Sequence, residues 1–396
     1  MQTPENSARA ASPRNWPRLL AAGLVCARLA ALLGMTLEGL RGYGDLPHFF
    51  QVSSLPGWPF FHYWMEYPPV LAFLSALIAR AAGGQEHVYI YLFYFVLTLA
   101  DAGSLYLFAR LAERLYPGTF QGVRIGAYLL VLLSVAYAWW NFDAIPVFWM
   151  LLGIYLLFRG RLNASGAALA AGILSKFFPG LALLAGWRRL TLGQYARWTA
   201  LALLPSLLVW GWLWAASPAF TAASVGAQGA KGSWETVWAL LDGNYVTGML
   251  GPAAGRTDPA SAATRTGQPA RIPPWASLIV FGGLGLAGLL RLRPQDDRQS
   301  LAVLGFGWSL FLLWSPGWSP QWILYLLPLV LLALPERQAL LFALMLVFIN
   351  LLEWPILLSR GFFYALPLTI FLRTLLLALL AWVFYGVSKE SSGRMV

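Results

Sequence analysis

Apolar segments recur along almost the whole of this chain, and their recurrence limits the folds that it can adopt. They lie at about residues 19–37, 67–79, 88–109, 125–140, 144–158, 162–175, 177–187, 198–216, 275–290, 301–314, 321–335, 339–352 and 365–387. Only 11% of the residues are charged, whereas soluble domains carry about 25%. In a bilayer, α-helices satisfy their own backbone hydrogen bonds. We therefore predict an all-α, polytopic transmembrane helical bundle with about 11–13 membrane elements and a cavity facing outward.

The basic residues predict the orientation of this bundle. Many of the arginines fall in short loops between apolar segments, at positions 110, 114, 124, 159, 161, 188, 189, 197, 291, 293 and 298. Cytoplasmic loops carry such an excess, so we interpret the net charge of +11 in this way and not as a nucleic-acid-binding surface. We expect cytoplasmic tails at 1–18 and 388–396, a transmembrane domain at 19–387, and outer loops at 38–66 and 217–274.

This orientation leaves one more apolar segment between residues 45 and 110 than the number of membrane crossings requires. Residue 45 outside and residue 110 inside require one crossing, but two apolar segments lie between them. The segment at 67–79 is shorter than the roughly 20 residues that cross a bilayer. We therefore expect that it does not fully span.

The second outer loop, at 217–274, is rich in Ala, Gly, Ser, Thr and Pro. Two readings remain open. It could be a flexible loop, or its amphipathic stretch at 233–241 could lie along the membrane interface.

The first outer loop carries the most polar chemistry, with Asp45, His48, His62 and Glu66. Asp45 lies close to where a span emerges, where a carboxylate could remove a proton from a hydroxyl at the membrane surface. Its position before Leu-Pro is also typical of a helix N-cap. The sequence leaves both readings open.

Two further charged residues lie at the tips of short apolar segments. Asp143 precedes Ala-Ile-Pro146 and could act with another carboxylate or cap a helix. Lys176 lies between two apolar half-helices, where an ammonium group is costly unless it is paired or solvated. Binding a lipid phosphate or reaching the interface would each explain it.

Other features exclude several kinds of site. Arg28 and Asp101 both fall within apolar spans and are expected to form a structural pair. The three histidines have no metal-ligand spacing, and no phosphate-binding glycine loop or common hydrolase motif is present. A reaction here would need a carrier that arrives through the membrane.

Short motifs spread over residues 44–328 resemble the polytopic GT-C glycosyltransferases. Within them, the chain is most similar to the bacterial polyprenyl-phosphate-mannose-dependent mannosyltransferases of phosphatidylinositol mannoside synthesis. The motifs are Gly44-Asp45, Glu66-Tyr-Pro-Pro69, Asn141-Phe-Asp143, Ser175-Lys176-Phe-Phe-Pro179, Trp234-Glu-Thr-Val-Trp-Ala-Leu241, Ser319-Pro-Gln321-Trp322 and Leu327-Pro328, in the family's order.

The resemblance implies the transfer, with inversion, of a mannose-like hexose from a polyprenyl-phosphate carrier. The acceptor would be a lipid, glycan or protein at the extracytoplasmic face of the cell (plasma or inner) membrane. Asp45 is implied as the general base, with Lys176 and Arg41 at the donor phosphate. The residues expected to contact substrate are His48, His62, Glu66, Tyr67, Asp143, Trp318 and Gln321.

Two departures from the family pattern matter. Asp45 has no acidic neighbour, so no cofactor is expected; a divalent cation could bind such a site but is not expected here. No histidine follows His87, which leaves the residue that supports the base unassigned.

Two other functions fit parts of the sequence. A transporter or lipid flippase would also have broken helices and an intramembrane lysine, but no inverted repeat relates the two halves. A membrane acyltransferase usually needs a buried histidine, and the histidines here lie in or near early loops.

Overall fold

The computed structural model describes residues 15–41, 45–134, 136–245 and 251–389. Helices make up 77% of the chain. The described residues form no strand, only isolated bridges such as Trp234 with Gly317. Gly44 of the Gly44-Asp45 motif and parts of both predicted tails, 1–14 and 390–396, lie outside the described residues. The prediction of an all-α bundle is confirmed.

The first half of the chain contributes helices of very different lengths. In order they are α1 (Trp16–Gly34), α2 (Leu37–Arg41), α3 (Leu46–Ser53), α4 (Pro69–Ala81), α5 (Glu86–Leu115), α6 (Gly122–Ser134), α7 (Ala136–Trp140), α8 (Ala144–Phe158), α9 (Leu162–Ser175), the 3₁₀ helix η1 (Phe178–Gly186) and α10 (Leu192–Ala216).

The second half begins with short elements and ends with long ones. They are α11 (Pro218–Ala230), α12 (Val237–Asp242), the 3₁₀ helices η2 (Ala253–Thr257) and η3 (Pro259–Ala263), α13 (Pro274–Arg291), α14 (Asp297–Trp314), the 3₁₀ helix η4 (Pro320–Trp322), α15 (Ile323–Ala333), α16 (Glu336–Leu351), the π-helix η5 (Leu352–Leu358), the 3₁₀ helix η6 (Phe363–Ala365) and α17 (Leu366–Val387).

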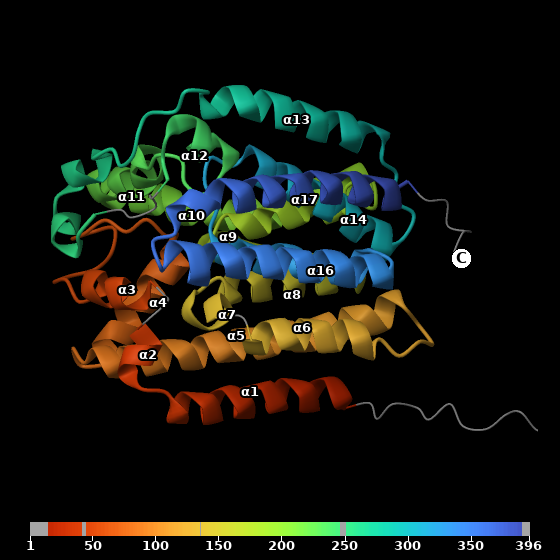
Figure 1. Ribbon diagram of the computed structural model, residues 1–396, viewed down its shortest axis with the longest axis horizontal. Helices are drawn as coiled ribbons and strands as arrows, with labels where there is room; N and C mark the ends of the chain where they lie inside the picture. The colour runs from red at the N-terminus through yellow and green to blue at the C-terminus, as the bar shows by residue number, and fades with distance from the viewer. Residues whose placement is uncertain (1–14, 42–44, 135, 246–250, 390–396) are drawn as a thin grey trace, which may run out of the picture.

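The long helices run side by side, and the short ones gather at one end (Figure 1). Helices α2, α3, α4, α11 and α12 lie at this end, on the left of the view. Every residue of α15 is buried, so this helix forms the centre of the bundle. Polar groups can therefore meet at the loop end without interrupting the apolar core.

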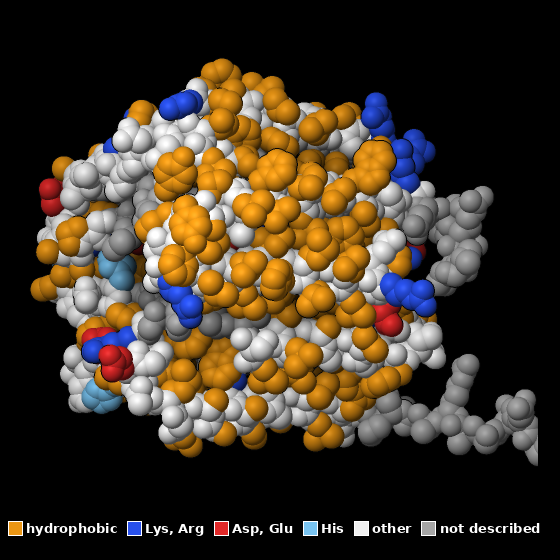
Figure 2. Space-filling view, in the orientation of Figure 1, with side chains coloured by type: hydrophobic (Ala, Val, Ile, Leu, Met, Phe, Trp, Pro, Cys, Tyr) orange, Lys and Arg blue, Asp and Glu red, His pale blue; other side chains and the backbone are white. Residues whose placement is uncertain are grey.

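Six helices among the described residues are long and apolar enough to cross a membrane, and five shorter apolar helices accompany them. Apolar side chains cover the middle of the face seen in Figure 2, and charged side chains lie mainly toward its two ends. A soluble protein does not expose so broad an apolar surface. The chain is therefore a membrane protein.

Helix α4 has 13 residues and is not among the six long helices. At about 1.5 Å per residue it is only about 20 Å long, too short for a core of about 30 Å. This agrees with the expectation that the segment at 67–79 does not fully span.

The arginine-rich loops meet at the end of the bundle opposite the short helices. Asp297, the first residue of α14, binds Arg114 near the end of α5 at 2.6 Å and Arg189 before α10 at 2.5 Å, which joins three segments that are far apart in the sequence. Arg124 donates hydrogen bonds to the carbonyl groups of Leu331 and Leu334 at the end of α15. The predicted cytoplasmic loops thus share one face.

The segment at 217–274 is folded, so the flexible-loop reading is wrong for its described part. Helix α11 packs against η3 and α10. The Ser224 hydroxyl accepts a hydrogen bond from the Met65 amide at 3.1 Å, and Gln228 donates to the Glu66 carbonyl at 3.1 Å. Tertiary contacts with the first loop therefore order a helix that is not strongly apolar.

Candidate active site

A polar cavity of about 310 Å³ opens at the end of the bundle that holds the short helices. Its lining comes mainly from both predicted outer loops and from the turn before α15, with Asn141 from between α7 and α8 and Trp354 from η5. The lining residues are Asp45, His48, Phe49, Glu66, Tyr67, Asn141, Gln228, Lys231, Trp234, Glu235, Gly251, Ser319, Pro320, Gln321 and Trp354. We call this hollow the polar cavity.

A second, more apolar hollow of about 500 Å³ adjoins it and is called the apolar groove. Its lining includes Phe177, Phe178, Leu181, Phe311, Trp314 and Trp322. Glu66, Tyr67, Gln228, Lys231, Trp234, Ser319 and Gln321 line both hollows. One ligand with a polar head and an apolar tail could therefore occupy the two together.

Asp45 lines the polar cavity from the start of α3. It occupies the N-cap position, but its side chain makes no capping hydrogen bond. A capping role therefore does not account for the Asp45 carboxylate. The side chain is exposed, and the space it faces is the cavity.

The walls of the cavity displace bulk water around this carboxyl group and so raise the pKa of Asp45. The ammonium group of Lys231 opposes the rise, and the carboxylate of Glu66 adds to it. A carboxylate with a raised pKa is a stronger base than a free one.

Lys176 lies at the border of the apolar groove, where α9 ends. Its Nζ is 2.7 Å from Oδ1 of Asp143, and the Tyr325 hydroxyl donates to the same oxygen at 2.7 Å. The rings of Phe178 and Trp322 lie 4.9 and 5.8 Å from Nζ. Lys176 is thus held in place by an anion and aromatic rings.

Asp143 does not line either hollow, which differs from its expected role as a substrate-contacting residue. Its side chain is 1% exposed and is bound by Lys176 and Tyr325. Although Asp143 stands at the N-cap of α8, it makes no capping hydrogen bond. The Asp143 carboxylate thus contacts the Lys176 ammonium group directly.

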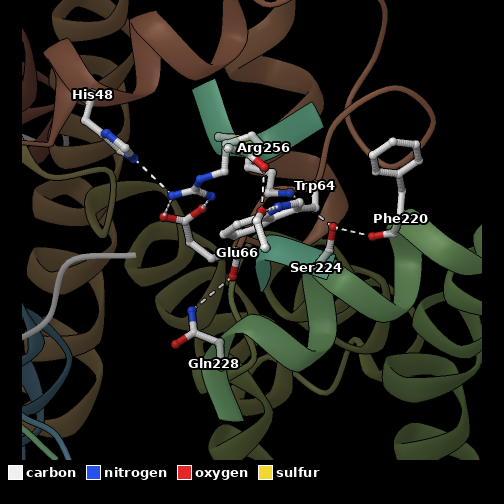
Figure 3. A network of polar contacts seen from close by, with 10 residues as sticks. His48, Trp64, Glu66, Phe220, Ser224, Gln228 and Arg256 are labelled. Atoms are coloured by element: carbon white, nitrogen blue, oxygen red, sulfur yellow. Dashed lines mark hydrogen bonds and ion pairs between the residues drawn. The ribbon is translucent and has the colours of Figure 1, made fainter. Parts of the chain in front are cut away.

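A buried arginine, Arg256, joins the two outer-loop segments beside the polar cavity (Figure 3). Both terminal nitrogens of its guanidinium bind the carboxylate of Glu66, one of them at 3.1 Å. The guanidinium also lies 3.8 Å from the centre of the Trp64 ring. Glu66 is therefore a fixed, charge-compensated wall of the cavity.

Burial disfavours the charged form of Glu66, but the hydrogen bonds and charge of Arg256 outweigh burial and lower the pKa of Glu66. Glu66 is thus ionised at neutral pH, and a base role for it would be weak.

His48 completes this network. Nε2 of His48 lies 3.1 Å from a terminal nitrogen of Arg256. Arginine can only donate, so Nε2 accepts and the ring proton is on Nδ1. Burial, together with the charge of Arg256, lowers the pKa of His48, so the imidazole is neutral at neutral pH.

Lys231 was not predicted as a site residue, although the chain has only three lysines. It follows α11, lines both hollows, and lies with Nζ 4.1 Å from the centre of the Trp234 ring. Among the described residues it forms no ion pair. Burial lowers its pKa, and the carboxylates of Glu66 and Asp45 oppose that effect.

Besides Asp143, three predicted site residues lie outside both hollows. Arg41 is bound to Glu86 at 2.8 and 2.9 Å on the surface, so its charge is already compensated. Nδ1 of His62 accepts from the Trp58 amide within its own turn. Trp318 is buried behind the cavity, where its indole nitrogen lies 3.4 Å from the Asn350 side-chain oxygen.

Gln321 and Tyr67, also predicted, line both hollows. Gln321 belongs to η4, directly before the buried helix α15. The Tyr67 ring packs edge-on against Phe142 with ring centres 4.3 Å apart. Both side chains are thus held at the junction of the hollows by the rigid parts of the bundle.

The expected pair of Arg28 and Asp101 is confirmed. Their side chains meet at 2.6 Å and are 1% and 2% exposed. Arg28 also donates to the Leu132 carbonyl at 2.6 Å. Within the residues that the structure describes, no group of three or more His, Cys, Asp and Glu side chains could hold a metal ion.

The geometry combines an exposed carboxylate in the polar cavity, a lysine shared by both hollows and a second lysine in the adjoining apolar groove. No protein-family model, curated protein or solved structure matches this chain. The similarity to the GT-C enzymes therefore rests on the sequence motifs, and membership of that family stays a prediction.

Proposed function

We propose that this protein is a membrane glycosyltransferase of the GT-C type. It would move a hexose, expected to be mannose-like, from a polyprenyl-phosphate carrier to a hydroxyl group of a lipid, glycan or protein. One observation carries the proposal: the polar cavity with Asp45 adjoins the apolar groove, Lys231 lines both hollows, and Lys176 lines the groove.

The two hollows match the two ends of such a donor. A polyprenyl chain is apolar and fits the aromatic and aliphatic lining of the groove. A sugar has many hydroxyl groups and fits a cavity lined by Gln228, Ser319 and Gln321. The phosphate that joins sugar to lipid would then lie at the shared boundary.

Asp45 is the base in this reaction. Its carboxylate takes the proton of the acceptor hydroxyl, whose oxygen attacks the anomeric carbon of the sugar. A new carbon–oxygen bond forms on one face while the bond from that carbon to the phosphate oxygen breaks on the other, so the configuration inverts. Polyprenyl phosphate leaves with the bonding electron pair.

Lys231 and Lys176 stabilise the charge that grows on the leaving phosphate. Such preorganised cations act most strongly where water is excluded. Lys231 borders both hollows and has no carboxylate partner among the described residues. Lys176 is paired with Asp143, so its ammonium group is held in position but its charge is partly compensated by the carboxylate. This assignment replaces Arg41 by Lys231.

The orientation follows from the arginine-rich end. Cytoplasmic loops of membrane proteins are enriched in arginine and lysine. The polar cavity lies at the opposite end of the bundle, so we place it at the extracytoplasmic face of the cell membrane. A lipid-linked donor is suited to that face because it diffuses within the bilayer.

The test is a transfer assay with purified protein in lipid nanodiscs. The donor is a synthetic mannosyl polyprenyl phosphate with a radiolabelled sugar, and the acceptors are lipid and glycan extracts of an envelope. The proposal predicts a labelled product and free polyprenyl phosphate in equal amounts. Counterflow of the labelled donor in proteoliposomes without any covalent product would instead identify a transporter or flippase.

A further inference from the structure

Glu235 lines the polar cavity but was not expected from the sequence to contact substrate. It precedes α12 and has a positive φ of 51°, which is unusual for a residue other than glycine. Both neighbours are fixed: the Trp234 amide and the Thr236 hydroxyl donate to the Pro316 carbonyl at 3.2 and 2.9 Å. The backbone thus holds Glu235 in one place.

Arg373, in the long helix α17, anchors the same residue. Its guanidinium donates to the backbone carbonyl of Glu235 and to the carboxylate of Glu353. It also lies 4.4 Å from the centre of the Trp318 ring. The charge of Arg373 is therefore compensated by Glu353, and Glu235 receives an anchor for its backbone instead of a counterion for its side chain.

The side chain of Glu235 has no such compensation. Its Oε2 is buried and has no hydrogen-bond partner among the described residues. Leaving a carboxylate oxygen buried and unpaired is costly, and a carboxyl group commonly keeps its proton instead. Burial and the neighbouring carboxylate of Glu353 raise the pKa of Glu235 to about 8, against the opposing charges of Arg373 and Lys231.

We propose that Glu235 is a protonated, hydrogen-bond-donating residue that binds an oxygen of an anionic phosphodiester in the polar cavity. The inference rests on the proposed function, and it assigns a residue that the similarity to known enzymes does not. The acid donates to the ligand, whereas its ionised form would repel the ligand and offer no donor.

The protonated state is needed because of the other charges at the site. Asp45 must be ionised to act as a base, and Glu66 is compensated by Arg256. A second uncompensated carboxylate would cancel the ammonium group of Lys231, which lies on the same cavity wall. A neutral Glu235 leaves that cation free to bind the phosphate.

The experiment measures binding of mannosyl farnesyl phosphate, a short phosphodiester donor, to the full chain in nanodiscs by isothermal titration calorimetry. A phosphodiester does not titrate near neutral pH, so any pH dependence belongs to the protein. In the wild type, affinity should fall roughly tenfold between about pH 7 and about pH 9, because the acid form is lost as the pH rises through the pKa of Glu235.

The variants separate the charged groups that face Glu235. Glu235→Gln cannot ionise and keeps a donor, so its affinity should stay constant over this range. Lys231→Arg should keep the wild-type fall, because arginine does not lose its proton there. Glu113→Gln is the matched control. It removes a carboxylate on α5 that binds Arg110 and lines neither hollow, so this variant should also keep the wild-type fall in affinity.

An unchanged fall in Glu235→Gln, or a fall that disappears only in Lys231→Arg, would overturn the inference. Infrared difference spectroscopy of the wild type adds a test that needs no variant: a carboxylic-acid band should vanish along the same pH range, and its absence there would also overturn it. Transfer by the wild type at neutral pH tests the proposed function separately, so the two failures are distinguishable.

Discussion

Two buried ion pairs in this protein have similar geometry and different surroundings. Arg28 and Asp101 meet at 2.6 Å, and Lys176 and Asp143 meet at 2.7 Å. The first pair is 1% and 2% exposed and lies between helices α1 and α5. The second borders the apolar groove, with the Lys176 side chain 11% exposed.

The comparison teaches that a charge within an apolar segment is not by itself a site. Arg28 is 1% exposed and binds Asp101 and a backbone carbonyl, so burial leaves it no access to a ligand. Lys176 keeps one side toward a hollow that also reaches Lys231 and Gln321. Access to a hollow, and not depth in the bundle, separates a structural charge from a functional one.

The largest expected effect concerns the buried pair of Arg28 and Asp101. Asp101→Leu leaves the Arg28 guanidinium buried without a counterion and should lower the free energy of unfolding by about 3–5 kcal/mol. The measurement is reversible unfolding in detergent by denaturant titration. The double variant Arg28→Met with Asp101→Leu should recover most of the loss, and a single variant as stable as the wild type would contradict the structural role.

At the two hollows, we expect a substitution to affect sugar transfer strongly and stability little. Lys231→Gln removes a cation that has no ion-pair partner among the described residues, so stability should change by less than about 1 kcal/mol. Sugar transfer should fall about 10²–10³-fold, since the leaving phosphate loses an electrostatic partner. Initial rates and unfolding curves check the two parts, and an undiminished rate would remove Lys231 from the site.

A smaller effect is expected on the pH dependence of transfer. Glu66 raises the pKa of Asp45. Glu66→Gln removes that negative charge, so Asp45 should ionise at lower pH and the acidic limb of the rate profile should move down by up to about one pH unit. The control Glu113→Gln should leave the limb in place, and a limb that moves upward in Glu66→Gln would be incompatible with this electrostatic picture.

The smallest effect should follow from Arg41→Gln. Arg41 forms an exposed pair with Glu86, and such pairs contribute about 1 kcal/mol or less. Transfer should stay within about threefold of the wild-type rate, a range equivalent to less than one kcal/mol. A loss of more than tenfold would restore the role at the donor phosphate that the sequence predicts for Arg41.

Most of the helices could be predicted because residues next to each apolar run mark where the helix begins and ends. Helices α8 and α9 lie where apolar runs are bounded by polar or arginine residues, and both have the predicted limits. Helix α11 could not be found in this way. Its sequence is rich in alanine and glycine, and two hydrogen bonds fix its place: Ser224 accepts from the Met65 amide and Gln228 donates to the Glu66 carbonyl in the first loop.

Some residues of the polar cavity could be predicted because each stands out within a short sequence motif. Asp45, Glu66 and Gln321 stand out in short motifs and line the polar cavity. Arg256 and Glu235 were missed because their roles depend on distant partners: Arg256 binds a residue 190 positions away, and Glu235 is anchored by Arg373 from the last helix. No local pattern reports such pairing.

The most direct measurement compares sugar transfer by the wild type and by Asp45→Asn under the same donor and acceptor concentrations. The asparagine has the same shape but cannot accept the proton, so the rate should fall about 10²–10⁴-fold while donor binding persists. Asp258→Asn, an exposed aspartate at the start of η3, serves as the control and should transfer at the wild-type rate. Equal rates for wild type and Asp45→Asn would contradict the assignment of the base.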